Sequence, residues 1–298
     1  NNNNNNNQSA LSSDQRTHQN FAFSGATALD EATLIAIAGE RMRRSIFTRI
    51  DVFEEIRWFE AATTITTTGE QEDIDLTRSV VYFGEIGGND YNYAIGSGDN
   101  VSSVVPRLVR PVIGRLTSAI HRLLRKGVRN LLVQGQFPQG CLSLYLTLFR
   151  GLATPVDYDS HGCITDVNRI SARHNQLLRE VLDNARKAYP DAEIVYLDTY
   201  YAYLHLLENA AAYNITNTVD ACDPRDASRF SGQEGAAFAP RVVDTCTNPQ
   251  NYLSWDSVHM TDATYGILSR LFVTDPRFSS PYPNFLSRCA SSVTSTNS

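Results

Sequence analysis

The 298-residue sequence predicts an α/β fold in which parallel strands are covered by helices on both faces. Three short, β-rich apolar runs, at 79–83, 129–134 and 193–197, have the length and composition of buried strands. Each run lies near a segment with helical periodicity. In sheets of this kind, ligands bind at the carboxyl ends of the strands, so we expect the functional residues there.

The helical segments are indicated by apolar residues that recur every three or four positions. This spacing runs through 105–124, where Gly127 is suited to end the helix, and again through 170–185. A third segment, 50–62, carries three glutamates, which we interpret as a solvated face and not as an acid/base pair: Glu54, Glu55 and Glu60.

The chain is predicted to contain one folded domain, at residues 20–298, after a disordered start at 1–19. The first seven residues are asparagines, and the polar run that follows them buries too little to offset its ordering entropy. Further loops are expected at 63–73 and 224–251, and the tail at 291–298 should fray. No internal repeat is visible in the sequence.

Charge and hydropathy exclude two classes of function. Lys and Arg number 26 and Asp and Glu 32, so the net charge is 26 − 32 = −6, which argues against nucleic-acid binding. No apolar run approaches the roughly 20 residues that a membrane-spanning helix needs, so we expect no transmembrane segment. No signal peptide is visible at the start of the sequence given.

Two short motifs offer catalytic chemistry. Gly84-Glu85-Ile86-Gly87-Gly88-Asn89-Asp90 directly follows the first predicted strand, and the amide of Asn89 is suited to donate to a developing oxyanion, although a plain turn is the alternative. In Asp256-Ser257-Val258-His259 the aspartate can hold the imidazole in one tautomer, which leaves the other nitrogen as a general base. The alternative is a surface histidine beside a carboxylate.

The order of four longer stretches resembles the plant GDSL esterase/lipase branch of the SGNH hydrolases. They are NFAFSGATALD at 20–30, VVYFGEIGGNDYNYA at 80–94, VQGQFPQGCLSLYLTLF at 133–149 and YLSWDSVHMTDATYGIL at 252–268. The resemblance implies a three-layer α/β/α, flavodoxin-like fold with a parallel sheet. It also implies hydrolysis of small-molecule or lipid esters by Ser, His and Asp, with no metal and no organic cofactor.

The resemblance assigns roles to four residues of this sequence. Gly25 matches the glycine whose backbone N–H serves the oxyanion hole, and Asn89 matches the side-chain donor to the same hole. His259 matches the general base and Asp256 its partner. The remaining histidines, among them His161 and His174, have no partner motif and are expected to be surface or hydrogen-bonded core residues.

The nucleophile of the family is missing from this sequence. Family members begin with a strand that ends in Gly-Asp-Ser, and this triplet does not occur in the 298 residues. Ser12 and Ser13 lie too close to Gly25, because a strand, a crossover helix and a second strand need upwards of about 30 residues. We therefore expect a truncated chain or a damaged gene model, with a gap between a strand ending near Phe23 and the strand at 79–83. The alternative is that these two strands close up and pair directly. The alternative to an esterase is an inactive relic or a ligand-binding protein that keeps the cleft.

The five cysteines are consistent with secretion, which the family resemblance also implies. Cys141 with Cys163 and Cys222 with Cys246 each flank a loop and are candidate disulfides, which leaves Cys289 unpaired. No Cys-x-x-Cys pair supports a zinc site. Asn100 and Asn214 lie in Asn-x-Ser/Thr sequons and are candidate glycosylation sites, so the sequence predicts a secreted, extracellular protein.

Overall fold

A four-stranded sheet forms the centre of the computed structural model, which describes residues 19–64, 74–98, 101–103, 105–149, 156–223 and 245–281. The strand order is β1-β2-β3-β6. β1 pairs with β2 and β2 with β3 in parallel, whereas β6 runs antiparallel to β3. The strands are β1 (Val80–Phe83), β2 (Asn130–Gln134), β3 (Glu193–Leu197) and β6 (Ser279–Ser280). The predicted α/β class is confirmed, and each predicted strand matches an observed one to within a residue.

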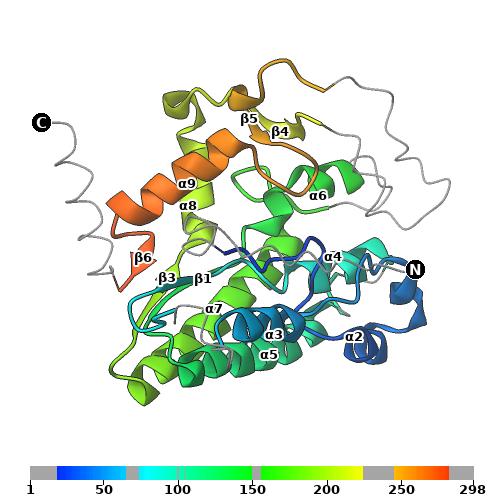
Figure 1. Ribbon diagram of the computed structural model, residues 1–298. Helices are drawn as coiled ribbons and strands as arrows, with labels where there is room; N and C mark the ends of the chain where they lie inside the picture. The colour runs from blue at the N-terminus through cyan, green and yellow to red at the C-terminus, as the bar shows by residue number, and fades with distance from the viewer. Residues whose placement is uncertain are drawn as a thin grey trace, which may run out of the picture.

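The helices form layers on the two sides of this sheet (Figure 1). α2, α3, α5 and α7 lie on one side, where α5 packs against α7 and α3, and α8 and α9 lie together on the other. The helices are α2 (Glu31–Ala38), α3 (Val52–Ala62), α4 (Gly88–Gly96), α5 (Val105–Lys126), α6 (Ser143–Leu148), α7 (Thr165–Ala188), α8 (Thr199–Glu208) and α9 (Asp262–Thr274), and short 3₁₀ helices lie at Glu40–Arg44, Gln139–Cys141, Ala210–Tyr213 and Pro249–Asn251.

The core lies where the apolar stripes of α5 and α7 face the sheet. Leu108, Val112, Leu116, Ile120 and Leu124 of α5 are each at most 1% exposed, as the helical spacing predicts. The stripe of α7 is buried in the same way over the predicted 170–185 segment. Full burial of one such side chain stabilises the fold by about 1.5–3 kcal/mol, so these two helices anchor the sheet from one side.

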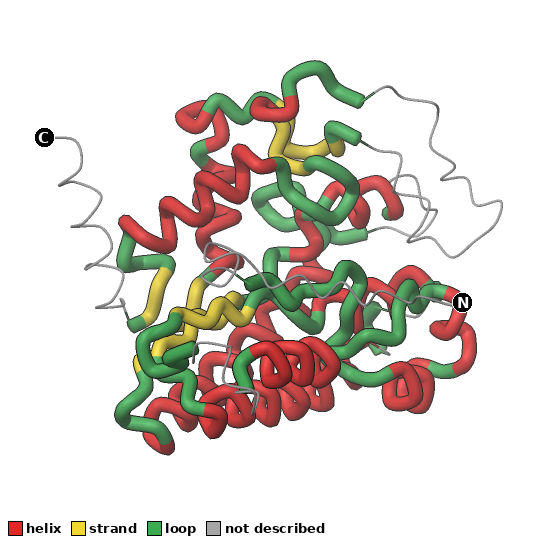
Figure 2. The backbone as a smooth tube through the Cα atoms, viewed as in Figure 1, coloured by secondary structure: helices red, strands yellow, loops and turns green. Residues whose placement is uncertain are grey.

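A second, smaller sheet lies away from the first (Figure 2). It consists of β4 (Asn217–Ala221) and β5 (Tyr252–Ser254), which run parallel. Cys222, directly after β4, is bonded to Cys246, and Cys141 is bonded to Cys163. The first bridge closes the chain between β4 and β5, and the second joins the 3₁₀ helix at Gln139–Cys141 to the segment before α7.

The prediction of a strand ending near Phe23 is wrong. Residues 19–23 form no strand, and the segment pairs only at a single bridge between Thr27 and Asp51. Among the described residues β1 therefore pairs with β2 alone and ends the sheet. One face of β1 is open there, since Val80 and Tyr82 are 49% and 54% exposed. Helix cover on both faces, expected for the whole sheet, is thus incomplete at this strand.

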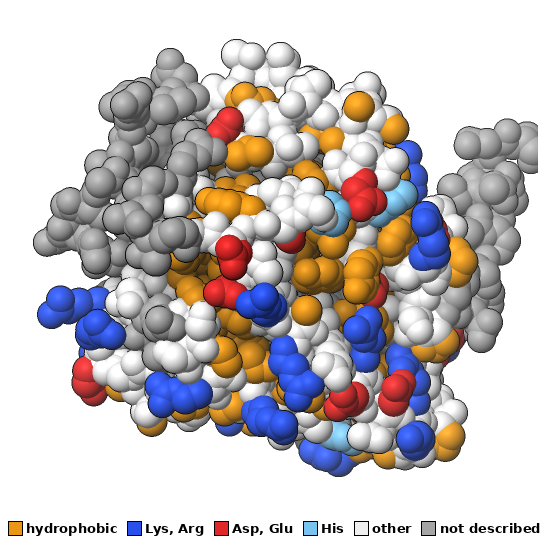
Figure 3. Space-filling view, turned by 180° about the vertical axis from the view of Figure 1, so that it is seen from behind, with side chains coloured by type: hydrophobic (Ala, Val, Ile, Leu, Met, Phe, Trp, Pro, Cys, Tyr) orange, Lys and Arg blue, Asp and Glu red, His pale blue; other side chains and the backbone are white. Residues whose placement is uncertain are grey.

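The surface opposite the view of Figure 1 carries apolar side chains across its middle and Lys and Arg side chains below them, with Asp and Glu interspersed (Figure 3). Elsewhere on the described structure, ion pairs join Arg122 with Glu60 and Arg186 with Asp183. None of the helices in the described ranges combines the length and the apolarity that crossing a membrane requires.

Candidate active site

Asp256 and His259 form a hydrogen-bonded pair in the loop between β5 and α9. The Nδ1 atom of His259 lies 2.7 Å from Oδ2 of Asp256. The other carboxylate oxygen accepts the backbone N–H groups of Val258 at 2.7 Å and of His259 at 2.5 Å. This arrangement places the Nδ1 proton against the carboxylate, so the basic nitrogen of the neutral imidazole is Nε2.

The environment keeps Asp256 ionised. Burial alone would raise its pKa, but the hydrogen bonds from His259 and from the backbone outweigh burial and hold the pKa below the ordinary value. The imidazole itself is 54% exposed and the carboxylate 14% exposed. The pair therefore combines a fixed, negatively charged partner with an accessible base.

The loop that carries this pair is held at both ends by threonine hydroxyls. Thr261 caps the first turn of α9 and also donates to the carbonyl of Tyr252 at 2.8 Å. Thr264 donates to the carbonyl of Leu253 at 2.9 Å, and the backbone N–H of Trp255 donates to the carbonyl of His259. These bonds fix the direction of the imidazole relative to β5.

Gly25 occupies a position that only glycine can fill. Its φ is +85°, and a Cβ there would lie 2.7 Å from a ring carbon of Phe47 and 2.9 Å from the hydroxyl of Tyr93. That hydroxyl donates to the carbonyl of Gly25 at 2.7 Å, which orients the peptide. Within the described ranges no hydrogen-bond acceptor is found for the N–H of Gly25.

Asn89 lies beside Gly25 because the first turn of α4 is fastened to the segment around it. The side-chain amide of Asn89 donates to the carbonyl of Ala26 at 2.9 Å. Asp90 accepts the backbone N–H groups of Ala28 at 2.7 Å and Leu29 at 2.9 Å. Burial raises the pKa of Asp90 to about 7, although these two bonds oppose the shift. The structure thus brings two of the predicted donors, Gly25 and Asn89, together.

Glu85 follows β1 at the C-terminal end of the strand. It lies between the pair Gly25 and Asn89 and the pair Asp256 and His259. Its carboxylate accepts the N–H of Gly88 at 3.0 Å, and His259 is close enough for its charge to act on it. Glu85 therefore links the Asn89 side of the site to the His259 side. Sequence reasoning passed over Glu85, although a glutamate two residues after a strand, inside the Gly84–Asp90 motif, was a signal that could have identified it.

Two other polar groups that sequence reasoning did not place here hold neighbouring segments: His174 contacts Tyr91 of α4, and Asn175 contacts Gln136, which follows β2. The Nδ1 atom of His174 lies 2.9 Å from the hydroxyl of Tyr91, and burial lowers the pKa of His174 to about 3. Asn175 accepts the N–H of Gln136 at 2.7 Å and donates to its carbonyl at 2.9 Å. His174 is thus a hydrogen-bonded core residue, one of the two outcomes that the sequence left open.

Several sequence candidates lie outside this arrangement. Glu60 pairs with Arg122, and Glu55 accepts the N–H of Phe23, so neither forms an acid/base pair. His161 pairs with Glu208 at 2.8 Å. Ser12, Ser13, Asn100 and Cys289 fall outside the described residues. Among the residues that the structure describes, no cluster of three His, Cys, Asp or Glu side chains could hold a metal ion.

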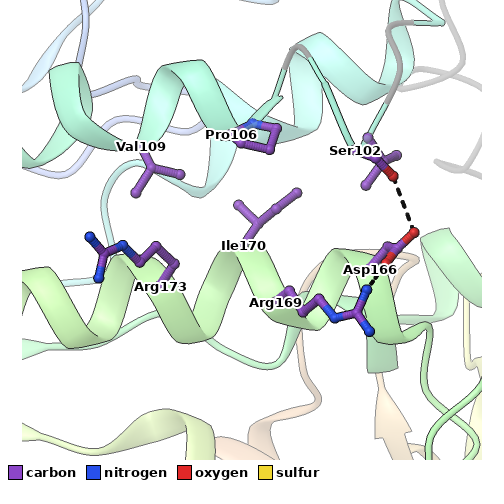
Figure 4. Close-up of a pocket in the computed structure, with 8 residues that line it drawn as sticks. Ser102, Pro106, Val109, Asp166, Arg169, Ile170 and Arg173 are labelled. Carbon is purple, nitrogen blue, oxygen red and sulfur yellow. Dashed lines mark hydrogen bonds and ion pairs between the residues drawn. The ribbon is translucent and has the colours of Figure 1, made fainter.

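A separate cavity of about 400 Å³ lies between the start of α5 and the start of α7 (Figure 4). Val109 and Ile170 form its apolar walls, and Asp166 bonds both Ser102 and Arg169 across its end. None of the four predicted site residues lines it. The cavity is therefore distinct from the site at the carboxyl end of β1.

Comparison with known proteins shows the family to which the chain belongs. Residues 4–272 match the sequence profile of the family described as GDSL-like lipase/acylhydrolase. Three GDSL esterase/lipases of Arabidopsis thaliana are 34%, 32% and 35% identical to the chain. These matches cover 86%, 88% and 87% of this chain and 77%, 67% and 66% of the respective relatives. The chain belongs to the GDSL-like lipase/acylhydrolase family.

Proposed function

We propose that this chain provides the general base and two oxyanion donors of a carboxylic ester hydrolase. The single observation that carries the proposal is the 2.7 Å contact between Nδ1 of His259 and the Asp256 carboxylate, in a chain of the GDSL family. Gly25 and Asn89 are the proposed donors. The side-chain amide of Asn89 is held beside Gly25 by its hydrogen bond to the carbonyl of Ala26.

The chemistry follows from this arrangement. His259 takes a proton from an attacking hydroxyl through Nε2, and Asp256 stabilises the imidazolium that forms. The N–H of Gly25 and the amide of Asn89 donate to the carbonyl oxygen as it becomes negative. Loss of one such donor typically costs about 10²–10³ in turnover. The reaction needs neither a metal ion nor an organic cofactor.

The attacking serine is proposed to come from outside the 298 residues. Gly-Asp-Ser does not occur in them. Ser257 lies within the loop of the catalytic pair but is 4% exposed, which leaves a substrate little access to its hydroxyl. Ser24 is exposed but precedes the donor Gly25, where the family has no nucleophile. The sequence as given should therefore hydrolyse esters no faster than background.

An assay of residues 1–298 on p-nitrophenyl acetate, beside the His259→Ala variant, tests this proposal. We expect equal, near-background rates, because without a serine no acyl-enzyme forms. In a serine protease, loss of the nucleophile costs about 2 × 10⁶ in turnover. Robust turnover that disappears in the variant would show that a serine of this chain, such as Ser24 or Ser257, acts as nucleophile.

We also propose that the protein works in an oxidising, extracellular compartment. The bridges Cys141–Cys163 and Cys222–Cys246 are compatible with this, because disulfides persist mainly in secreted proteins. Asn214 is exposed and lies within a sequon, so it is available for glycosylation. Expression through a eukaryotic secretory pathway should add a glycan at Asn214, and the variant Asn214→Gln should lack it. If the secreted variant is no lighter than the unmodified chain by the mass of a glycan, Asn214 is not a glycosylation site.

A further inference from the structure

Three polar side chains crowd around Gly88 at the floor of the site. A Cβ on Gly88 would lie 2.5 Å from Oε1 of Glu85, 2.9 Å from Nε2 of Gln139 and 3.1 Å from Oε1 of Gln136. Gln136 and Gln139 are 1% and 3% exposed. The carboxyl of Glu85 and the side chains of two buried glutamines therefore approach the same point beside Gly88, and the side chain of Gln136 is within hydrogen-bonding range of Glu85.

Two acceptors of this cluster lack a hydrogen-bond donor among the described residues. The amide groups of Gln136 and Gln139 donate to the carbonyls of Ile86 at 3.0 Å and of Gly88 at 3.5 Å. The side-chain oxygens of both glutamines are buried and have no donor among the described residues. An unmet buried acceptor costs about 1–3 kcal/mol. The one nearby group that can acquire a proton is the carboxyl of Glu85.

We infer that Glu85 is protonated in the folded protein and donates a hydrogen bond to a side-chain oxygen of Gln136 or Gln139, while its other oxygen accepts the N–H of Gly88. The side-chain carboxyl group of Glu85 then joins Gln136, which follows the C-terminal end of β2, to the first turn of α4. We call this link the clasp. Through Gly88 it positions Asn89. Glu85 is thus a positioning residue for the oxyanion donor, a role that rests on the function proposed above.

The electrostatics of the site favour the neutral carboxyl. Burial raises the pKa of Glu85, and this effect exceeds the lowering by its hydrogen bonds and by His259. A carboxylate here would add a negative charge close to where the substrate oxygen becomes negative, and so oppose the transition state. The other titratable groups that face Glu85 come from β1, α4, α6 and α9: Tyr82, Asp90, Tyr91, Tyr145 and Tyr265.

Carbon-detected NMR of the full chain, labelled at the glutamate carboxyl carbons, tests the protonation directly. The resonance of Glu85 is identified by its loss in Glu85→Gln. We expect this resonance to keep the chemical shift of a protonated carboxyl at pH 7, whereas exposed glutamates titrate near pH 4.3, as they do in peptides. Titration of Glu85 together with the exposed glutamates would overturn the inference.

The positioning role is tested by the side-chain amide signals of Asn89, identified by their loss in Asn89→Asp. Glu85→Gln keeps a donor and an acceptor in place and should leave these signals unmoved, as should the exposed control Glu180→Gln. Glu85→Ala should shift them. A shift in Glu85→Gln as large as in Glu85→Ala would contradict the clasp. If Glu85→Ala does not fold, the comparison of Glu85→Gln with the unmodified chain decides alone. None of these signals depends on ester hydrolysis, so the outcome is independent of whether the proposed function holds.

Discussion

Two buried residues behind the site respond to pH in opposite directions. The pKa of Asp90 is raised from 3.8 to about 7 by burial, so its contribution to stability is present below pH 3.8 and is lost as the pH rises through 7. The pKa of His174 is lowered from 6.5 to about 3, so its contribution is present above pH 6.5 and is lost as the pH falls towards 3. Between about pH 4 and 6.5 the two slopes oppose each other.

Replacement of His174 by glutamine should separate these two effects. Glutamine still hydrogen-bonds to Tyr91 but does not titrate. We compare the free energies of unfolding of the unmodified chain and of His174→Gln. The value for the unmodified chain, minus that for the variant, should rise by about 5 kcal/mol between pH 3 and 6.5. The reason is that the pKa of His174 is lowered from 6.5 to about 3, and each pH unit of that interval contributes about 1.4 kcal/mol. Urea unfolding across this range measures the difference, and a constant difference would contradict the burial of a neutral imidazole.

Loss of the Asp90 carboxyl should detach α4 from the segment around Gly25. Asp90→Ala leaves the buried N–H groups of Ala28 and Leu29 without an acceptor, at about 1–3 kcal/mol each. We expect a loss of roughly 2–5 kcal/mol in the free energy of unfolding at pH 5, below the folded-state pKa of about 7, where most of the contribution of Asp90 to stability is still present. The control Asp183→Ala removes an exposed ion pair with Arg186 and should cost at most about 1 kcal/mol. Equal losses of unfolding free energy in the two variants would contradict the role of Asp90 in holding α4 to the segment around Gly25.

At the level of single residues, the sequence predicted the contact between Asp256 and His259 but not the contacts of Asp90 and His174 that hold the elements around the candidate site. Asp256 and His259 are three positions apart, so their contact is local and their spacing reveals it. Asp90 bonds residues 61 and 62 positions away, and His174 bonds Tyr91 across 83 positions. Contacts of that length depend on how α4 and α7 are placed around the sheet, which no local pattern records.

At the scale of elements, periodicity identified the helices that face the core with one stripe. α5 and α7 show such a stripe over their whole length and were predicted. α4 was not predicted, because seven of its nine residues are buried, so polar and apolar positions do not alternate around it. The expected strand near Phe23 failed for a related reason, since a short apolar run ending in glycine fits a packed loop as well as a strand.

The two disulfides tie irregular segments to these elements, and their removal should be costly. Cys141 and Cys163 close a loop across 22 positions, for which chain entropy predicts a loss of about 3 kcal/mol in the double variant Cys141→Ser/Cys163→Ser. Thiol titration of the denatured, unreduced protein should find one free thiol per chain, because two bridges leave one of five cysteines. Three or more thiols would show that a bridge is absent.

At the scale of the whole molecule, the chain combines the proposed base His259 and the proposed donors Gly25 and Asn89 with a sheet that, in its described part, ends at an open strand. β1 pairs with β2 alone in the described structure, and the open face of Val80 and Tyr82 lies on the same strand that leads to Glu85 and Asn89. A further parallel strand beside β1 would end near the site. A serine at the carboxyl end of such a strand would lie where the proposed mechanism requires a nucleophile.

Labelling by a fluorophosphonate probe, which reacts with activated serines, tests the central claim most directly. The experiment compares residues 1–298 alone with the same chain preceded by the first segment of a GDSL relative, which carries the Gly-Asp-Ser strand. We expect no labelling of the chain alone, labelling of the fused chain at the added serine, and a strong reduction of that labelling by His259→Ala. Labelling of the chain alone, or a folded fusion that stays unlabelled, would contradict the assignment of Gly25, Asn89, Asp256 and His259 to an esterase site that awaits its serine.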